Sequence, residues 1–383
     1  ALFESQNLLL SADIISALSV EASLSTRQVF NPAIHKLKKH KGQNLAAKNI
    51  YNLLNGSEIS NSHKNCIKVQ DPYCMRCIPH IHGTSWDVFS YSEKTINNEI
   101  NSISDNPLIF RNGSVQNSGH FHAEPIAQTL DSLSIAVSEI GAISERRIHY
   151  IMKGADGNLP LFGAVNSGLE SGFMLPHVTA ASLASENKTL AHPSSVDSIS
   201  TSGGQEDIVS MAPWAGRSCL KIIENVRRIL AIELLVSGNV NYRFHAKLQS
   251  SKSLTPLMDL LKKSNVLSKL IVYVPKDNID ELDYAMFNAG AGSVGAYDQC
   301  HYRSEGFGTF RPNKNAIPFI GEPNERSEVK EFKVEYLVRN HLLNNVLRAM
   351  KIAHPYEEVA HDIIPINNTN NYEGIGMIGS LDK

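Results

Sequence analysis

Three residues with side chains suited to bind and protonate a small molecule lie in the segment VQDPYCMR, Val69 to Arg76. Gln70, Tyr73 and Arg76 follow one another at three-residue steps, so a helical turn would place all of them on one side. A guanidinium binds carboxylates, and a tyrosine can transfer a proton when a nearby cation or electrophile lowers its pKa from about 10. The same spacing also fits a loop braced by buried polar groups.

A second segment, TSGGQEDIVSMAPWAGRS (Thr201 to Ser218), carries Glu206 and Asp207 beside a pair of glycines. Because helical periodicity follows, we expect a long helix to begin here. Acidic residues at a helix start interact favourably with the positive end of the helix dipole. The alternative is that one carboxylate points into a pocket and pairs with a basic group of a ligand.

Several short runs of His, Cys and Glu have the residue types of metal or redox sites. They are His80 with His82, His120 with His122, Cys74 with Cys77, and HPYEE at 354–358. Neither histidine pair has cysteine or carboxylate partners at the spacing that zinc sites show, HPYEE offers its ligand types only within one short run, and a single CxxC is weak evidence for redox chemistry. We therefore expect no metal site, and a turn at HPYEE.

Composition favours small-molecule chemistry over a highly charged partner. The 383 residues include 36 basic and 38 acidic side chains, which gives no overall field for nucleic acid or an anionic membrane. The five cysteines are odd in number and irregularly spaced, so a disulfide framework is not expected and a reducing cytoplasm fits. No apolar run approaches the roughly 20 residues of a membrane span.

The spacing of apolar residues changes near residue 265. Before it, Pro125 to Met152 has apolar residues at steps of three and four, as a long helix requires. Similar patterns predict a helix ending before Asp105 and another through Ile222 to Leu230. Several long helices imply a bundle, and the polar loops between them are suited to carry a site.

After residue 265, short strands alternate with helices. The pattern predicts strands at 269–275, 332–338 and 359–366, and helices at 341–353 and from a cap at Asp277 to Gly290. A glycine-rich aromatic stretch that continues through Phe310 takes the place of the second strand in this order. A strand-helix-strand order that occurs twice is typical of a ferredoxin-like α+β domain. We therefore predict two domains: a mainly α, long-helix bundle at 1–265 and a small ferredoxin-like domain at 266–383.

Residues 1 to about 263 resemble the histidine ammonia-lyases, of the aromatic amino acid lyase family. The resemblance rests on SHKNCIKVQDPYCMRC (62–77), NSISDNPLIF (101–110), SGHFHAEPIA (118–127), SERR (144–147), SGFM and ASENKTLAHPSSVDS (within 171–198), and QEDIVSMAP (205–213). It implies an all-helical homotetramer whose active sites are each assembled from several subunits. These enzymes convert L-histidine to urocanate and ammonia with a methylidene-imidazolone (MIO) electrophile made from an internal Ala-Ser-Gly.

The resemblance assigns roles by motif. Tyr73 would assist proton transfer, Arg76 would hold the substrate carboxylate, and Gln70 would position its neighbours. Phe121 would form a wall of the pocket, and Glu206 would face the imidazole. Phenylalanine-specific relatives tend to have an amide at the last position, and a carboxylate can accept a hydrogen bond from an imidazole N–H that a phenyl ring lacks.

Two departures from the family pattern stand out. His120 occupies a position where many relatives have Asn, which adds a titratable group beside the expected pocket. The 383 residues also contain no Ala-Ser-Gly, so we expect a fragment of a longer enzyme that is inactive alone. Acid-base groups without the electrophile would contribute only about 100- to 10,000-fold. The alternative is a catalytically inactive lyase-like scaffold with a binding or oligomerisation role.

The tail from about Lys269 resembles another family, the PII-like or CutA-like domain inserted in the NGG-interacting-factor-three family. The matching segments are KLIVYVP (269–275), AGAGSVGAYDQC (289–300), EGFGTFRP (305–312), NAIPFIGE (315–322) and AHPYEEVAHDI (353–363). The resemblance implies a trimer-forming sensor-like domain. The paired metal ions of that family are held by a flanking domain whose ligands are absent here, so no metal is predicted.

Overall fold

The computed structural model describes residues 1–63, 68–166, 168–263, 266–294 and 297–369. The chain divides into two compact units, Ala1–Met258 and Asp259–Lys383. The division falls within helix α10 (Thr255–Lys263). Each unit has its own apolar core.

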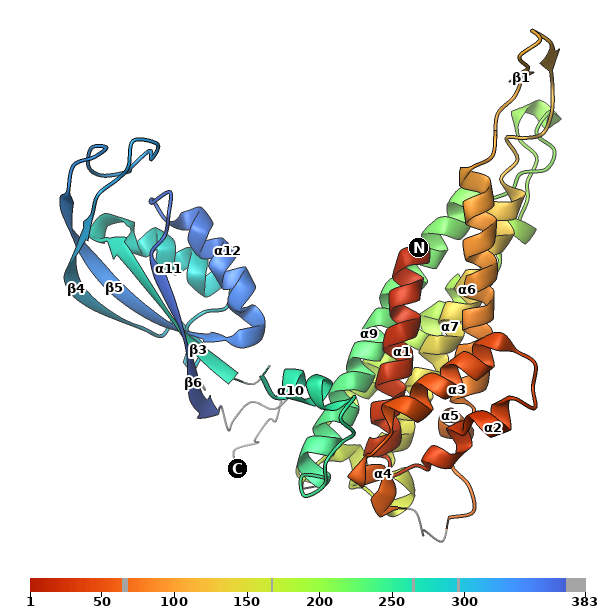
Figure 1. Ribbon diagram of the computed structural model, residues 1–383, viewed down its shortest axis with the longest axis horizontal. Helices are drawn as coiled ribbons and strands as arrows, with labels where there is room; N and C mark the ends of the chain where they lie inside the picture. Colours follow the sequence, from red (N-terminus) through yellow and green to blue (C-terminus); the bar gives the residue numbers. More distant parts are fainter. Residues whose placement is uncertain (64–67, 167, 264–265, 295–296, 370–383) are drawn as a thin grey trace. The chain divides into compact units, whose positions relative to one another are not determined.

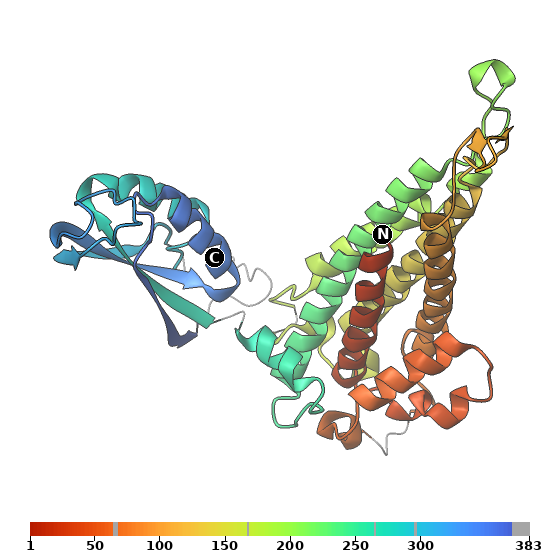
Figure 2. The same cartoon turned by 45° about the horizontal axis from the view of Figure 1, so that its top comes forward.

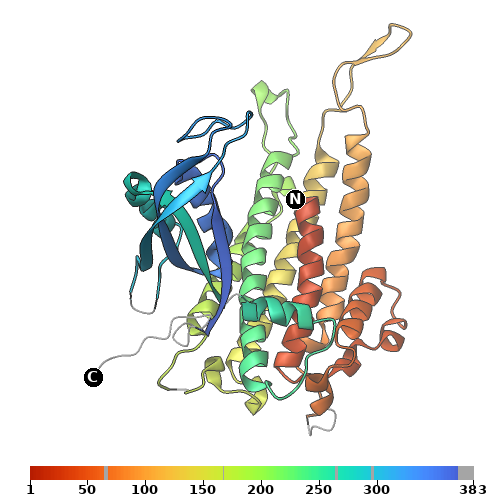
Figure 3. The ribbon, with the colours of Figure 1, turned by 60° about the vertical axis from the view of Figure 1, so that its left-hand side comes forward.

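The first unit is a bundle of helices. Its long helices are α1 (Leu2–Ala22), α6 (Ile78–Ile100), α7 (Glu124–Met152) and α9 (Ala212–Phe244), which run side by side (Figures 2 and 3). Helix α8 (Met174–Leu190) packs against α7 and α9. The shorter helices are α2 (Pro32–His35), α3 (Lys41–Leu53), α4 (Glu58–Ser62) and α5 (Tyr73–Arg76).

The apolar stripe that predicts α7 faces the interior of the bundle. Leu133, Val137 and Ile140 are almost fully buried, and the predicted helix at 125–152 is confirmed. Helix α6 ends at Ile100, before Asp105 as predicted. Burying one stripe of each helix removes apolar surface from water, which is the main favourable term in folding. The same core includes Leu8, Leu9, Ala12, Trp86, Phe89, Cys219, Ile222, Ile223, Val226 and Leu230.

Two glycines allow α3 and α6 to approach closely. A Cβ atom on Gly42 would lie 2.0 Å from the carbonyl oxygen of Gly83, so neither helix could keep its position with a larger residue there. Such contacts fix the position of α6, whose first turn follows directly after α5. In the described part of the chain, no helix is both long and apolar enough to cross a membrane.

A short hairpin and a series of turns extend the bundle. Strands β1 (Leu108–Ile109) and β2 (Val115–Gln116) pair antiparallel between α6 and α7, and they project beyond the helix ends (Figure 1). The segment between α8 and α9 contains single 3₁₀ turns at Ser194–Val196 and Ser202–Gly204. The polar connections of the bundle therefore gather near its helix ends rather than in its core.

In the second unit, the described strands form one antiparallel sheet in the order β4-β5-β3-β6. They are β3 (Val266–Pro275), β4 (His301–Phe310), β5 (Ser327–Arg339) and β6 (His361–Thr369). Helices α11 (Ile279–Asn288) and α12 (Leu343–Ala353) pack together and cover one face of the sheet (Figure 1). The core between sheet and helices includes Leu270, Val272, Val274, Ile279, Leu282, Met286, Val334, Tyr336, Val338, Val346 and Met350.

The predicted alternation in β5 is confirmed, whereas the predicted cap of α11 is wrong. Val334, Tyr336 and Val338 are buried against the helices, and Lys333 lies on the opposite face of the sheet. Asp277 lies inside a 3₁₀ turn, Lys276–Asn278, and the α-helix begins at Ile279 with Asn278 as its N-cap, one residue later than expected. The backbone after Pro275 first tightens into this turn before it adopts α geometry.

Candidate functional site

Tyr73 and Arg76 are brought together by the single turn of α5. The guanidinium carbon of Arg76 lies 4.7 Å from the centre of the Tyr73 ring, a cation-π contact, and Tyr73 is 71% exposed. Gln70 is exposed and precedes the helix, so the prediction that one turn holds all three residues is wrong for Gln70. Pro72 caps the turn in an extended conformation, and the fixed φ of proline makes it a natural helix boundary.

A polar cluster that the sequence did not reveal anchors the segment before α5 to the end of α7. Lys68 Nζ lies 3.1 Å from the buried Asp71 and 2.8 Å from Asp156, and it donates a hydrogen bond to the hydroxyl of Tyr150. Burial opposes charge on Lys68, but hydrogen bonds with Asp156, Tyr150 and Asp71 outweigh it and raise its pKa. The cluster therefore holds Tyr73 near the carboxyl end of α7. The only local signal of this cluster was that Asp71 lies within the VQDPYCMR motif and Lys68 directly precedes it.

The CxxC pair lies in the same region. Cys74 and Cys77 are both free thiols, and burial raises the pKa of Cys74 to about 11. Reactive redox cysteines have the opposite shift, because their chemistry depends on the thiolate. Cys74 therefore lacks the electrostatic setting of a reactive redox cysteine.

Phe121 and His120 lie before the amino end of α7. Phe121 is 59% exposed, three residues before the first residue of the helix. The Nδ1 atom of His120 is 2.7 Å from the hydroxyl of Ser118, and Nε2 of His122 is 3.4 Å from the carbonyl oxygen of Ile208. The second contact links this loop to the loop that carries Glu206.

Glu206 lies in a turn rather than at a helix start. Helix α9 begins at Ala212, six residues later, so the helix predicted to start beside Glu206 does not include it. Gly203 and Gly204 have φ values of +67° and +91°, which side chains rarely adopt, and they fold the segment back on itself. Thr201 pairs with Glu206 through the backbone, and its hydroxyl donates to Glu206 Oε2 at 2.6 Å.

The helix dipole does not account for this carboxylate. Its effect falls off within the first turn, and Glu206 lies outside that turn. The side chain is exposed and held by Thr201 at one of its two oxygens. Its other oxygen is available to accept a hydrogen bond from a ligand.

The expected site residues form two groups at opposite ends of the bundle. Tyr73 and Arg76 lie near the end of α7, whereas Phe121 precedes its start, and Figure 1 shows α5 and the β1 hairpin at opposite ends of the unit. The 29 residues of α7 span roughly 40 Å at about 1.5 Å per residue. Within one chain, these two groups cannot contact the same small molecule.

The histidine runs have structural partners instead of a shared metal site. His82 is fully buried and pairs through Nδ1 with Asp13 at 2.8 Å, whereas His80 packs edge-on against the ring of His35. His354, in HPYEE, lies 3.0 Å from the carbonyl oxygen of Tyr273 and is part of a turn as expected. In the described ranges, no group of three or more His, Cys, Asp or Glu side chains is arranged to hold a metal ion.

Comparison with known proteins identifies the helical part of the chain. The aromatic amino acid lyase profile matches residues 1–263. A histidine ammonia-lyase of Burkholderia cenocepacia is 44% identical over 277 residues, which cover 72% of this chain and 54% of that protein. The Vibrio cholerae histidine ammonia-lyase is 46% identical over 264 residues, 68% of this chain and 52% of that protein.

A solved structure has the same fold over the same part. The crystal structure of histidine ammonia-lyase from Trypanosoma cruzi aligns with a TM-score of 0.62 and 39% identity, covering 69% of this chain and 49% of that one. The chain thus spans about half the length of the relatives it matches. From the profile match and the identity of these relatives, the chain belongs to the aromatic amino acid lyase family.

Proposed function

We propose that the helical unit supplies part of a histidine ammonia-lyase active site, which converts L-histidine to urocanate and ammonia. The proposal is supported by relatives of that name at 44% and 46% identity. The observation that carries it is the presence of two groups at opposite ends of one bundle: the exposed Tyr73 with the half-buried Arg76, and the exposed Phe121 with the exposed Glu206. Such an arrangement is expected when one active site takes residues from several chains.

In this proposal, Arg76 holds the carboxylate of the substrate. Its Nε atom is buried and donates no hydrogen bond to any described group, and an unsatisfied buried donor costs about 1–3 kcal/mol. A carboxylate that reached the guanidinium would remove this cost. Tyr73, whose ring is held by the same guanidinium, would move a proton at its phenol oxygen, and Gln70 would position these neighbours.

Glu206 would select histidine at the other end of the bundle. Thr201 fixes one carboxylate oxygen, which leaves the second to accept a hydrogen bond from an imidazole N–H. Phe121 would supply an apolar wall beside the ring. The neutral phenyl ring of phenylalanine offers the carboxylate no partner, so this pairing would favour histidine.

The electrophile of the family does not fit the residues of this chain. The methylidene-imidazolone forms from an Ala-Ser-Gly segment, and the 383 residues contain none. We therefore assign only binding, orientation and proton transfer to this chain. In our proposal the electrophile comes from a segment outside these residues, and a homotetramer brings the separate groups together.

For the second unit, we propose a ferredoxin-like domain of the PII/CutA type. The element order β3-α11-β4-β5-α12-β6 and the sheet order β4-β5-β3-β6 support this, because they match a split β-α-β arrangement.

We also propose a cytoplasmic location. The described cysteines Cys74, Cys77, Cys219 and Cys300 are all free thiols, which suits a reducing compartment.

A chimera tests the proposed activity. The part of the Vibrio cholerae relative that this chain does not cover is joined to residues 1–258, and urocanate formation is measured alongside the mass of the assembly. We expect turnover of histidine but not of phenylalanine. Replacing Glu206→Gln should lower kcat/KM for histidine roughly 10- to 100-fold, the effect of losing one charged hydrogen bond. Asp207→Asn, a neighbouring exposed carboxylate, is the matched control.

The proposal fails if a folded, oligomeric chimera produces no urocanate. Unchanged histidine turnover in the Glu206→Gln chimera would remove the assigned role of that carboxylate. An inactive chimera that still assembles would instead support the alternative of a lyase-like scaffold.

A further inference from the structure

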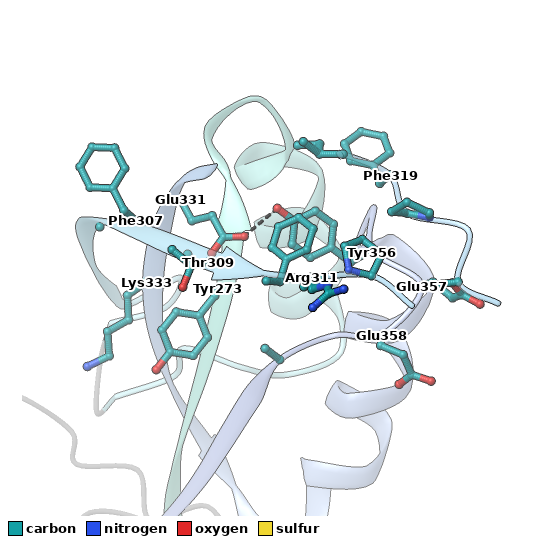
Figure 4. A pocket seen from close by; sticks show the side chains of 18 of the residues that line it. Tyr273, Phe307, Thr309, Arg311, Phe319, Glu331, Lys333, Tyr356, Glu357 and Glu358 are labelled. Carbon is teal, nitrogen blue, oxygen red and sulfur yellow. Dashed lines mark hydrogen bonds between the residues drawn. The ribbon is translucent and has the colours of Figure 1, made fainter. Parts of the chain in front are cut away.

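A pocket of about 600 Å³ lies within the second unit, and none of the residues that line it is one discussed above for lyase chemistry. It is bounded by β4, by the segment 311–320 that follows it, and by the turn at 356–360 (Figure 4). Tyr273 and Lys333 line it from the sheet face opposite the helices. Pockets that bind small molecules typically have volumes of about 300–1,000 Å³, so this one is large enough for such a ligand.

A buried carboxylate lies on the wall of this pocket. Glu331, on β5, is only 7% exposed, and the hydroxyl of Tyr356 donates to its Oε1 at 2.6 Å (Figure 4). Among the described residues this is the one hydrogen bond to the Glu331 side chain. A carboxylate can accept about four, so Oε2 retains most of its capacity.

Two glycines of β4 make room for this carboxylate and for a ligand. A Cβ atom on Gly308 would lie 2.1 Å from Glu331 Oε2, so a larger residue would displace the carboxylate. Gly306 lies directly opposite Glu331 in the ladder, and a Cβ there would meet nothing within 4 Å. The pocket is therefore open above Gly306, beside the carboxylate.

Aromatic rings line the pocket, and one of them, that of Tyr356, contacts the carboxylate through its hydroxyl. The centre of the Tyr356 ring lies 6.3 Å from that of Phe310 and 6.2 Å from that of Phe319. Phe307 and Tyr273 also line the pocket. The faces of aromatic rings attract cations, and the attraction strengthens when the cation is removed from water.

Two of the charged side chains that line the pocket, Lys333 and Glu305, take part in ion pairs. Lys333 Nζ lies 2.7 Å from Glu335, which Lys269 also contacts at 2.7 Å, and Glu305 lies 2.9 Å from Lys330. The hydrogen bond with Glu335 raises the pKa of Lys333. Lys333 and Glu305 carry opposite charges, so together they add nothing to the formal charge of the residues that line the pocket.

The remaining charged groups give the pocket a negative balance. Three carboxylates, Glu331, Glu357 and Glu358, face one guanidinium, that of Arg311, so the formal sum is minus two. Within the described ranges, none of these groups forms an ion pair, and Nε of Arg311 donates to a backbone carbonyl at 3.0 Å. A cation is therefore favoured over an anion.

We propose that this pocket binds a small planar organic cation, such as an amidinium, guanidinium or aromatic ammonium compound. Its N–H groups would donate to Glu331 Oε2, and its plane would pack against Tyr356, Phe310 and Phe319. The site requires no metal ion and no residue of the helical unit.

Isothermal titration of the full chain with three matched probes tests this proposal. Benzamidine carries the charge and the paired N–H donors, benzamide has a similar shape without charge, and benzoate carries the opposite charge. We expect benzamidine to bind at least tenfold more tightly than either of the others. Equal binding of benzamidine and benzamide, or tighter binding of benzoate, would overturn the proposal.

Two variants locate the binding. Glu331→Gln keeps an oxygen for the Tyr356 hydroxyl but removes the charge, and it should weaken benzamidine binding roughly 10- to 100-fold. Gly306→Leu fills the open space and should abolish binding while leaving Glu331 in place. Glu328→Gln, an exposed carboxylate on the same strand outside the pocket, is the matched control.

Thermal unfolding of each variant shows whether it retains its fold. If Glu331→Gln unfolds, Gly306→Leu still tests the location. Benzamidine binding that survives Gly306→Leu unchanged would place the site elsewhere and overturn the proposal.

Discussion

The two units each bury a glutamate, and the two side chains have very different partners. In the helical unit, Arg147 donates to both oxygens of Glu233 at 2.5 and 2.8 Å, and Ser19 and Ser144 donate at 2.6 and 2.5 Å. In the second unit, Glu331 accepts one described hydrogen bond, from Tyr356. A carboxylate whose acceptor sites are filled stabilises a fold, whereas one with open sites can bind a ligand.

The difference follows from where each glutamate lies. Glu233 is on α9 at a point where α1 and α7 converge, so donors reach it from both neighbouring helices. Glu331 is on a strand, and its side chain lies beside Gly308, which contributes no side chain to cover it. One site is closed by protein groups and the other is left open to a pocket.

The largest expected effect is on stability, when the charge of Glu233 is removed. Glu233→Gln leaves Arg147 buried with no counter-charge, which should lower the free energy of unfolding by about 3–5 kcal/mol. Urea unfolding followed by far-UV circular dichroism measures this change. The double variant Arg147→Met with Glu233→Gln should recover much of the loss, because no unpaired charge remains.

If Glu233→Gln lowers the free energy of unfolding by less than about 1 kcal/mol, the proposed contrast between Glu233 as a structural carboxylate and Glu331 as a ligand-binding one is wrong. Lys221→Met, at a partly exposed ion pair with Glu186, is a control for removing a weaker pair.

A smaller effect should appear in the pH dependence of the helical unit. Burial lowers the pKa of His82, so the folded state keeps this ring neutral where an unfolded chain, with a pKa of about 6.5, binds a proton. The unfolded state then takes up more protons as pH falls below about 6.5, and stability decreases by at most about 1.4 kcal/mol per pH unit for this group. Above that pH, His82 contributes no pH dependence.

Urea unfolding between pH 7.5 and pH 5 checks the sign for His82. His82→Gln should flatten this part of the curve, although it also lowers stability overall. A wild-type curve whose stability rises as the solution becomes more acidic would contradict the assignment.

The smallest expected effect is that of Glu331→Gln on stability. The amide oxygen of the glutamine can still accept a hydrogen bond from Tyr356, and its amide nitrogen would face the pocket. The free energy of unfolding should therefore change by less than about 1 kcal/mol. The same urea titration used for Glu233→Gln gives a direct comparison. A loss as large as that of Glu233→Gln would mean that Glu331 is a structural group rather than a ligand-binding one.

Local patterns were enough to predict several of the long helices and the strands β3, β5 and β6. The steps of three and four in Leu133, Val137 and Ile140 predict α7, and the alternation of Val334, Tyr336 and Val338 predicts β5. These predictions succeed because each element buries one face. The backbone geometry of a helix or strand fixes the sequence spacing of the residues on that face. Candidate ligand contacts such as Tyr73 and Glu206 also came from motifs.

The placement of those candidates was harder to predict. Pro72 ends the coil that holds Gln70, and the glycine turn at 203–204 separates Glu206 from the start of α9. The proline and the two glycines each act only on neighbouring residues. The spacing of the candidate residues, taken alone, instead predicted uninterrupted helix in both segments. Which end of the bundle each motif occupies depends on the lengths of α6 and α7 and on how they pack.

The amino-acid order alone thus determined the helical and strand segments, the near-neutral charge and the motifs of an aromatic amino acid lyase. The convergence of distant residues was decided by tertiary packing, which joins Arg147 to Glu233 across 86 positions and Tyr356 to Glu331 across 25. Periodicity reports which face of an element is buried. It carries no information about which side chains of other elements contact that face. Those contacts fill the acceptor sites of Glu233 and leave acceptor sites of Glu331 free for a ligand.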